Sequence, residues 1–172
     1  LSYSEAMGES TMHISESGIS DLTGLQYFKN LYVLECSDND LTQLDISENK
    51  ALTHLNCENN NLTALDTSNN PFLYVLFCKQ NNLTNLDVTN NTKLAALWCS
   101  GNQLTTLDVS KNTALKDLGC KNNQLTSLDL SNNKVLTGDE IVFDTSDNKY
   151  EISVIGNTFD LSTLPTGFDI SK

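Results

Sequence analysis

The sequence predicts a solenoid of short repeats, mostly β, with one parallel sheet along its concave side. Two observations carry this prediction. Cysteines recur at intervals of 21 residues along the chain, at Cys36, Cys57, Cys78, Cys99 and Cys120. Leucines keep the same interval two places before each cysteine, and asparagines keep it three places after. A fixed period of about 20 to 50 residues is the signature of a repeat architecture, in which each unit forms one coil of a stack.

Alignment of residues 31–136 on this period gives the unit L-x-x-L-x-C-x-x-N-x-L-x-x-L-D-h-S-x-N-x-x, where h is usually aliphatic. Each unit has a leucine at its start, one before the cysteine and one at the corner after the asparagine. These rows are Leu31, Leu52, Leu73, Leu94 and Leu115; Leu34, Leu55, Leu76, Leu97 and Leu118; and Leu41, Leu62, Leu83, Leu104 and Leu125. This spacing, with a period of about 20 to 29 residues, is typical of leucine-rich repeats.

The segment x-L-x-C-x of each unit alternates apolar with variable residues, as a half-buried strand requires. Stacked coils place equivalent strands in parallel and in register, about 4.8 Å apart. The asparagine after the strand can bond the backbone of its own coil and of the next through its side-chain amide, which satisfies groups that the bend leaves unpaired. We therefore expect an asparagine ladder.

The return half of the unit also alternates inward apolar and outward polar residues, as in Leu107-Asp108-Val109-Ser110. A unit of 21 residues leaves little room for a full helix, so we expect an extended, turn-rich convex side. Curvature of a solenoid arises from a small rotation at each repeat. Because the front and the back of each coil have similar spacings, only weak curvature is expected.

Three segments are expected along the chain: an N-terminal cap at 1–11, the solenoid at 12–136 and a C-terminal cap at 137–172. Met12 and Ile14 lie 22 residues before Leu34 and Cys36, so residue 12 begins one atypical coil ahead of the coils of 21 to 22 residues. After Leu136 the period fails. Residues 141–143 and 150–154 flank a polar turn at 147–149, as in a β-hairpin that caps the far end. The natural chain is expected to continue beyond residue 172.

These units resemble the cysteine-bearing leucine-rich repeats of bacterial surface proteins, in particular members of the internalin family with 21-residue repeats. The segment from Ile19 to Phe28, I-S-D-L-T-G-L-Q-Y-F, is also similar to an internalin coil. The resemblance covers residues 12–136. It implies a secreted, wall-attached bacterial protein that binds host or other extracellular proteins through the inner face of the solenoid, with no enzymatic activity in the repeats.

One stretch departs from that family. A wall-sorting signal reads L-P-x-T-G followed by an apolar tail, whereas Leu164-Pro165-Thr166-Gly167 is one residue short and has no such tail. We treat it as a coincidence, so the resemblance does not extend to wall attachment. The sequence also contains no apolar run of about 18 residues, and direct membrane insertion is therefore not expected.

Charge excludes one class of partner. The net charge is −12, and the basic residues are ten lysines without an arginine. Proteins that bind nucleic acid need a basic stripe to neutralise phosphates, so nucleic acid is not an expected partner. The acidic surface also disfavours anionic membranes and is typical of a soluble extracellular module.

The cysteine row invites a disulfide or metal interpretation, and neither is favoured. Parallel strands in register keep neighbouring Cβ atoms about 4.8 Å apart, beyond the roughly 3.8 Å that a disulfide prefers. A metal site needs convergent ligands, whereas the thiols of a ladder all point the same way into leucine. We expect reduced thiols that act as small hydrophobes, kept unreactive by a pKa that burial raises.

Aspartates form a second row within the motif D-x-S-x-N or D-x-T-x-N, at Asp45, Asp66, Asp87, Asp108 and Asp129. The motif imitates the first, third and fifth positions of a calcium loop, but it lacks the glycine and the glutamate that such a loop requires. It serves equally as a turn in which Asp and Ser cap backbone amides. Structural capping is expected, with calcium binding as the alternative, and no metal or cofactor is assigned.

The two histidines of the sequence do not indicate a catalytic site. His13 is expected beside Glu35 on the strand face, and His54 near Glu58. Neither lies by a nucleophile or in a motif that forms a pocket, so both are interpreted as surface polar residues and no catalytic residue is assigned.

Variable residues of the strand face are where binding is expected. Rows across the coils place Phe77 beside Trp98, the only tryptophan, both facing solvent. Adjacent aromatics with an apolar border and lysines at the edge match an interface hot spot. The alternative is cross-strand packing that stiffens the sheet. The expected ligand-binding residues are the anchors Phe77 and Trp98, their neighbours Tyr74 and Val75, and the rim residues Glu58, Lys79 and Lys121.

The sequence thus predicts a non-enzymatic recognition or adhesion module of a bacterial cell-surface or secreted protein, located outside the cell. Its partner is expected to be an extracellular protein or glycan, including one derived from a host, and the chain is expected to be a monomer. The alternative is a rigid structural spacer in a larger surface protein, whose strand face would be inert.

Overall fold

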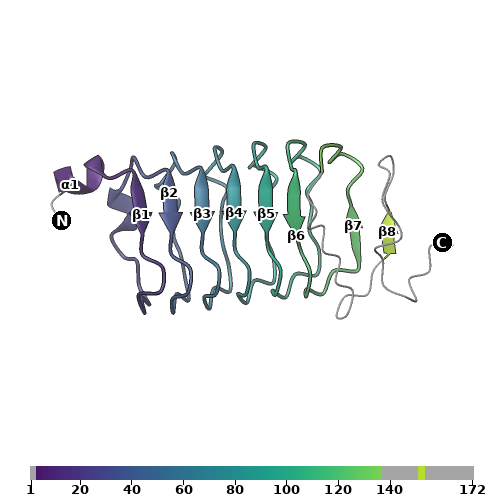
Figure 1. Cartoon of the computed structure of the whole chain (residues 1–172), viewed down its shortest axis with the longest axis horizontal. Coiled ribbons are helices and arrows are strands. Elements are labelled where there is room, and N and C mark those ends of the chain that lie inside the picture. Colours follow the sequence, from purple (N-terminus) through teal and green to yellow (C-terminus); the bar gives the residue numbers. More distant parts are fainter. Residues whose placement is uncertain (1–2, 137–150, 154–172) are drawn as a thin grey trace.

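Short strands, one from each coil, form a single parallel sheet along one side of the molecule (Figure 1). A computed structural model describes residues 3–136 and 151–153 of the chain. Within them the six-stranded sheet runs in chain order through β1 (Thr11–His13), β2 (Val33–Glu35), β3 (His54–Asn56), β4 (Val75–Phe77), β5 (Ala96–Trp98) and β6 (Asp117–Gly119). The predicted leucine-rich-repeat solenoid is confirmed.

The register follows the repeat. Leu34 pairs with Leu55, and Leu55 with Leu76, so equivalent residues of successive coils lie side by side. Met12 pairs with Leu34 in the same way, although β1 begins one residue earlier, at Thr11. In each of the strands β2 to β6 the central leucine is buried, while the flanking residues face outward.

The core is one narrow column that runs through the stack. The leucine rows and the cysteine row form a continuous buried cluster, and most of its members have no exposed surface. The convex side of one coil adds Leu44 and Ile46 to the core. Later coils have apolar equivalents of both, except that buried Thr67 stands in the place of Ile46 in the next coil. Each coil buries its apolar side only against its neighbours, so the stability of the solenoid depends on stacking.

The N-terminal end carries the helical elements of the described residues. α1 (Tyr3–Gly8) is a short helix, and η1 (Leu25–Tyr27) is a single 3₁₀ turn on the return side of the first coil. The side-chain amide of Asn30 donates to the carbonyl of Met7 at 2.6 Å, which ties α1 to the stack.

The predicted asparagine ladder is present at the end of each strand. The amide nitrogen of Asn81 donates to the carbonyl of Cys78 in its own coil (3.2 Å) and to that of Cys57 (3.0 Å). Its Oδ1 accepts the backbone N–H of Leu62 at 3.0 Å. The bridged neighbour is therefore the preceding coil, not the next one as expected. Asn39, Asn60, Asn102 and Asn123 bond the backbone in related ways.

A second asparagine ladder, not predicted from the sequence, runs along the convex side. The amide nitrogen of Asn70 donates to the carbonyls of Ile46 (3.0 Å) and Asn49 (2.9 Å), both in the preceding coil. Asn70 is fully buried. The other members are Asn49, Asn91, Asn112 and Asn133.

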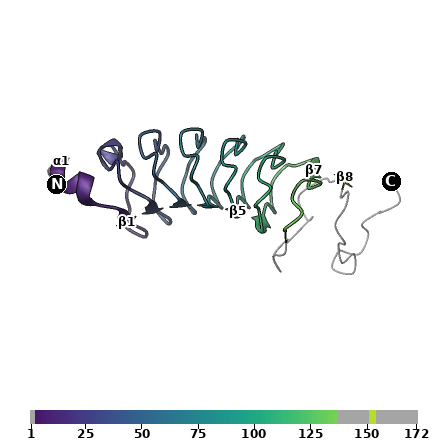
Figure 2. The same cartoon turned by 90° about the horizontal axis from the view of Figure 1, so that it is seen from above.

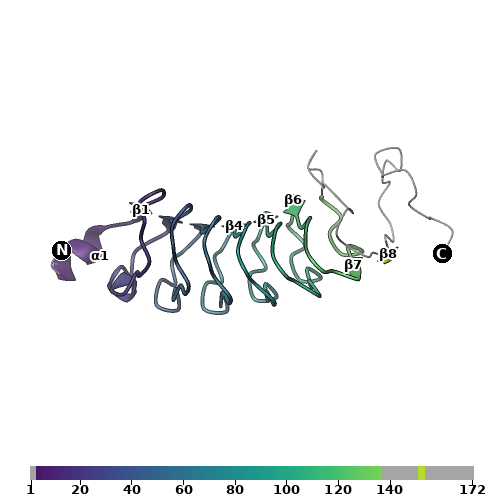
Figure 3. The ribbon, with the colours of Figure 1, turned by 90° about the horizontal axis from the view of Figure 1, so that it is seen from below.

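The convex side is extended and rich in turns, as predicted. Backbone bonds from Asn70 N–H to the Thr67 carbonyl and from Leu73 N–H to the Asn70 carbonyl close two successive turns in one coil, and later coils repeat them. Figure 2 and Figure 3 show the strands along one long side of the stack, the return segments along the other, and only gentle curvature.

Only residues 151–153 of the predicted C-terminal cap are described, so the hairpin itself stays a prediction. β7 (Ser127–Asp129) lies on the return side, and β8 (Glu151–Ser153) pairs with it in parallel, with Leu128 opposite Ile152. The strand expected at 141–143 and the turn at 147–149 lie outside the described residues, as does the stretch at 164–167. Residues 151–153 therefore extend the return side by the same parallel stacking as the solenoid, because a parallel partner completes the exposed edge of β7.

Candidate functional site

Two aromatic side chains meet on the sheet where the register predicts. Phe77 of β4 pairs with Trp98 of β5. Their rings stack with centroids 4.4 Å apart and an interplanar angle of 19°. Both residues are half-buried rather than freely exposed, because each ring covers one face of the other.

Polar groups hold the tryptophan in place. The indole Nε1 of Trp98 donates to Oδ2 of Asp117 at 2.9 Å, and Nζ of Lys79 lies 4.1 Å from the centre of the indole ring. Lys79 also forms an ion pair with Oε1 of Glu58 at 3.2 Å. We call Glu58, Phe77, Lys79, Trp98 and Asp117 the tryptophan cluster.

Asp117 is the member of the tryptophan cluster that sequence reasoning missed. The register pairs Trp98 with Gly119 and Ala96 with Asp117, so Asp117 is the diagonal neighbour of Trp98 across the sheet. Diagonal pairs are within reach of long side chains. Gly119 lies opposite Trp98, and Asp117 comes two residues before it in the sequence. This spacing could have predicted Asp117 as the partner of the indole N–H.

The other predicted site residues, Val75, Lys121 and Tyr74, are not members of the tryptophan cluster. Val75 is half-buried in β4, between His54 and Ala96 of the adjacent strands. Lys121 is half-buried in the same row as Lys79, two coils further on, and it forms no ion pair within the described residues. Tyr74 lies in a separate hollow.

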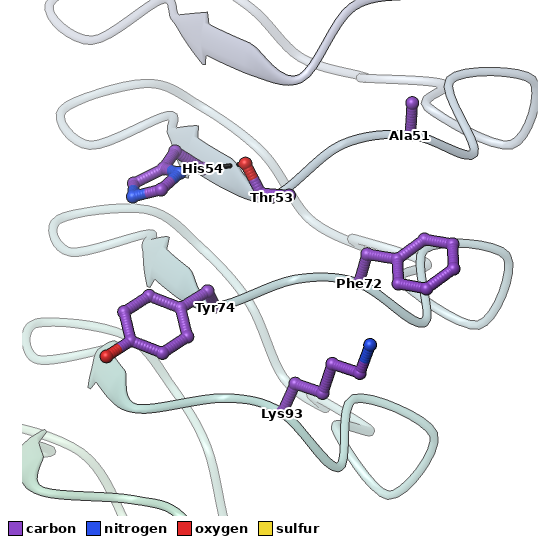
Figure 4. Close-up of a pocket in the computed structure, with 6 residues that line it drawn as sticks. All are labelled: Ala51, Thr53, His54, Phe72, Tyr74 and Lys93. Carbon is purple, nitrogen blue, oxygen red and sulfur yellow. Dashed lines mark hydrogen bonds between the residues drawn. The ribbon is translucent and has the colours of Figure 1, made fainter.

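This hollow, of about 480 Å³, opens where the chain leads into the strands. It is lined by Ala51, Thr53, His54, Phe72, Tyr74 and Lys93, and Figure 4 shows that three successive coils contribute them. Sequence analysis did not find it. The available signal was the row pattern, since Ala51 and Thr53 occupy the repeat positions where the next coil carries Phe72 and Tyr74.

The two histidines make different contacts on the strand side. Nδ1 of His13 lies 2.6 Å from Oε2 of Glu35, as predicted. His54 lines the hollow, and its expected position near Glu58 stays a prediction. Nδ1 of His54 lies 2.9 Å from the Thr53 hydroxyl, and its ring centroid is 6.2 Å from that of Tyr74.

All five cysteines are free and buried, as predicted. Burial raises the pKa of Cys36 and of Cys120 to about 12, and it raises the pKa of Cys57, Cys78 and Cys99 well above the ordinary value. The cause is desolvation, which disfavours the thiolate. The thiols are thus part of the core.

The aspartate row makes the predicted capping turns. Oδ1 of Asp87 accepts the hydroxyl (2.6 Å) and the backbone N–H (2.9 Å) of Thr89. These bonds lower the pKa of Asp87, because they stabilise its carboxylate form. The same turn recurs at Asp45, Asp66, Asp108 and Asp129. Within the described residues no group of three or more His, Cys, Asp or Glu side chains could hold a metal ion.

A calcium titration checks the structural interpretation of this row. The carboxylate of Asp87 is already used by backbone and hydroxyl donors of its own turn, so calcium has no preformed ligand set there. We expect the melting temperature to be nearly unchanged between chelator and millimolar calcium. A large rise that Asp87→Ala abolishes would reverse the assignment in favour of a metal ladder.

The lowered pKa values of these aspartates predict acid sensitivity. Each carboxyl has a lower pKa when folded than its unfolded value of 3.8. Its contribution to stability is therefore complete above the unfolded pKa and is lost as the pH falls from there through the folded value. Urea unfolding should show a constant midpoint from neutral pH down to about pH 5 and a decrease below about pH 4. Asp87→Asn should reduce that decrease, and an unchanged profile would contradict the assignment.

Comparison with known proteins identifies the fold. The functional domain of InlJ from Listeria monocytogenes, which includes a cysteine ladder, shares 31% identity over 80% of this chain and 40% of that chain, with a TM-score of 0.49. InlF from Listeria monocytogenes str. 4b F2365 shares 22% over 80% of this chain and 40% of that chain, with a TM-score of 0.71. Internalin C2 from the same strain shares 20% over 89% of this chain and 84% of that chain, with a TM-score of 0.66.

The chain spans 40% of the length of the InlJ and InlF structures. No protein-family model and no curated protein matches the sequence. The resemblance to internalins that the repeat unit predicted is confirmed among solved structures.

Among the described residues, no helix is long and apolar enough to cross a membrane.

Proposed function

We propose that this leucine-rich-repeat solenoid, which has the fold of internalins, is a non-enzymatic recognition module that binds an extracellular protein or glycan. The tryptophan cluster is the proposed contact surface, with Tyr74, Val75 and Lys121 around it. The module is proposed to belong to a bacterial protein that is secreted or held at the cell surface, and to act as a monomer.

The observation that carries this proposal is the fixed aromatic pair on the outward face of the sheet. Aromatic side chains dominate many interfaces because they bury a large apolar area with few rotatable bonds. Here the stacking of Phe77 and the bond to Asp117 already hold Trp98 in one orientation. Less conformational entropy is then lost when a partner binds.

Charge around the aromatic pair supports a polar rim. Lys79 presents a cation beside Trp98, and the half-buried carboxylate of Glu58 forms an ion pair with that cation. Rim charges mainly change the association rate and its salt dependence, while buried anchors set the affinity. The tryptophan cluster therefore has the composition of a small hot spot with its own rim.

The test is Trp98→Ala, assayed against purified extracellular proteins and glycans that bind the parent chain. Affinity is expected to fall by about 2 kcal/mol or more, roughly thirtyfold. The structure also predicts a stability loss of about 1 kcal/mol, because the variant leaves Asp117 without its indole donor. Urea unfolding of the variant measures that loss separately.

Thr105→Ala, an exposed change outside the tryptophan cluster, is the matched control and should leave binding and stability unchanged. Trp98→Phe removes the N–H and makes the ring smaller but keeps an aromatic ring against Phe77, so its affinity should fall less than that of Trp98→Ala. A partner that binds Trp98→Ala as tightly as the parent would place the recognition surface elsewhere.

A rigid spacer is the second candidate, and the two asparagine ladders favour it. They tie successive coils together at the strand side and at the convex side, as at Asn81 and Asn70. In a spacer the stacking of Phe77 on Trp98 would serve only to stiffen the sheet. The spacer is supported if Trp98→Ala lowers stability while no extracellular protein or glycan binds the parent chain.

A further inference from the structure

The hollow beside the strands has features that the tryptophan cluster does not explain. Phe72 and Tyr74 belong to the most exposed large apolar side chains among the described residues, with 48% and 46% of their surface accessible. They are uncovered because the preceding coil offers only Ala51 and Thr53 at the equivalent positions. Figure 4 shows both side chains on one coil with their rings turned toward opposite ends of the hollow, Phe72 near Lys93 of the next coil and Tyr74 near His54.

Hydrogen bonding places a proton on Nδ1 of His54. The Thr53 hydroxyl has one proton and donates it to the carbonyl of Tyr32 at 2.9 Å. It must therefore accept the bond from Nδ1 of His54 at 2.9 Å, which places the imidazole proton on Nδ1. When the ring is neutral, Nε2 is an acceptor, on the side of the ring that faces away from Thr53 in Figure 4.

Lys93 gives the hollow a positive charge. Its Nζ lies 4.5 Å from the centre of the Phe72 ring, and within the described residues it forms no ion pair. None of the six lining residues is acidic, in a chain whose net charge is −12. An uncompensated cation against an aromatic wall is complementary to an anionic group on an otherwise apolar ligand surface.

We propose that this hollow binds a pyranose sugar that carries one carboxylate. The C–H face of the ring would pack on Tyr74, and the carboxylate would pair with Nζ of Lys93, which lies against Phe72 at the other end of the hollow. Nε2 of His54 would accept a sugar hydroxyl, and the Tyr74 hydroxyl can donate or accept. The volume of about 480 Å³ lies within the usual range for small-ligand sites.

Other occupants fit the lining less well. A purely apolar side chain of a protein would bury Nε2 of His54 and Nζ of Lys93 without partners, which is unfavourable. A polyanion would meet the acidic surface of the rest of the chain. A single carboxylate avoids this repulsion, because charges beyond about 8 Å are largely screened at physiological salt. The proposal does not depend on the tryptophan cluster, which lies further along the strands.

The experiment uses ligand-observed saturation-transfer NMR and titration on the full chain. The acidic probes are 3′-sialyllactose and methyl β-D-glucuronide, the neutral match is lactose, and a glutamate-containing tripeptide represents protein carboxylates. At least one acidic sugar should bind with a Kd of about 1 mM, in the range of weak small-ligand sites. Lactose should bind about tenfold more weakly because it lacks the charge-assisted bond to Lys93.

Variants assign the binding to the hollow. Phe72→Ala and Tyr74→Ala should each weaken the acidic sugar about tenfold or more. Lys93→Gln should remove the preference over lactose. Ala51→Leu should block the hollow while every proposed contact stays in place, which covers the case that an aromatic variant fails to fold. Tyr27→Ala, an exposed tyrosine outside the hollow, and Trp98→Ala should bind as the parent does.

Three outcomes would overturn the proposal. One is the absence of saturation transfer to both acidic sugars at about 20 mM, well above the expected Kd. Another is binding that survives Ala51→Leu, Phe72→Ala and Tyr74→Ala. The last is a tripeptide that binds with the same sensitivity to these variants while the sugars do not, which would assign the hollow to a peptide partner.

Discussion

Replacement of Asn81 by alanine is expected to destabilise the solenoid by about 2 kcal/mol or more, although the side chain is polar. Asn81 satisfies the backbone N–H of Leu62 and the carbonyls of Cys57 and Cys78. Each buried backbone group that loses its partner costs about 1 to 3 kcal/mol. Alanine would leave the Leu62 N–H without a partner. Each carbonyl would lose one of two donors, because Asn60 also bonds the Cys57 carbonyl and Asn102 also bonds the Cys78 carbonyl. The change lies where coils join, so it should weaken stacking on both sides.

Asn82→Ala is the matched control for this prediction. Asn82 is the adjacent residue of the same type, but it is exposed, and its Oδ1 takes part only in a long contact of 3.5 Å with Gln103. Its replacement should change stability by less than about 0.5 kcal/mol. Urea unfolding of both variants measures the difference, and equal midpoints would show that the ladder contributes little.

Asn81→Asp separates hydrogen bonding from packing, because aspartate has nearly the same shape. It keeps the acceptor for Leu62 but loses both donors and faces the carbonyls of Cys57 and Cys78. Stability should fall at neutral pH and recover partly when the carboxyl is protonated, since the neutral acid can donate one bond. No recovery at low pH would indicate that shape alone matters at this position.

The cysteines should be almost inert to thiol reagents in the folded protein and should all react after denaturation. Desolvation raises the pKa of Cys36 from 9.0 to about 12, which lowers its thiolate fraction at a given pH by about three orders of magnitude. Complete burial adds a steric block, since Cys57, Cys78 and Cys99 have no exposed surface. Mass spectrometry after a timed exposure to iodoacetamide gives the rate for each residue.

The order of labelling is also predicted. Cys36 and Cys120 belong to the outermost coils of the cysteine row, and coils at the ends of a solenoid open more readily than central ones. They should react before Cys78. Thr84→Cys, at an exposed position, is the positive control and should be labelled at once. Rapid labelling of native Cys78, or an intramolecular bridge in the mass spectrum, would contradict the structure.

The backbone arrangement could be predicted because it is periodic. A residue that faces the core or bonds a neighbouring coil, such as Leu76, Cys78 or Asn81, recurs in each unit, so five copies report the same environment. The second asparagine ladder was visible in the sequence as a repeating residue, but its burial was not predicted. Asn70 and its equivalents recur equally, but the exposed turn that contains them gave no reason to expect burial.

The candidate site could be predicted only in part, because its residues are the ones that do not recur. The register alone places Phe77 beside Trp98. It does not show that the indole N–H reaches Asp117 or that Lys79 lies over the ring, since those contacts depend on side-chain rotamers. The ring contact that places Tyr74 beside His54 depends on rotamers in the same way.

The 21-residue period therefore determined by itself the coil, the parallel register, the buried thiols and the strand-side ladder. These follow from which residues repeat, because stacked coils impose one environment on each position. Only the tertiary structure decided the bonds of Trp98, the orientation of His54 and the hollow in front of Ala51. Each depends on differences in size and polarity between neighbouring coils, and such differences become contacts only when the coils are stacked.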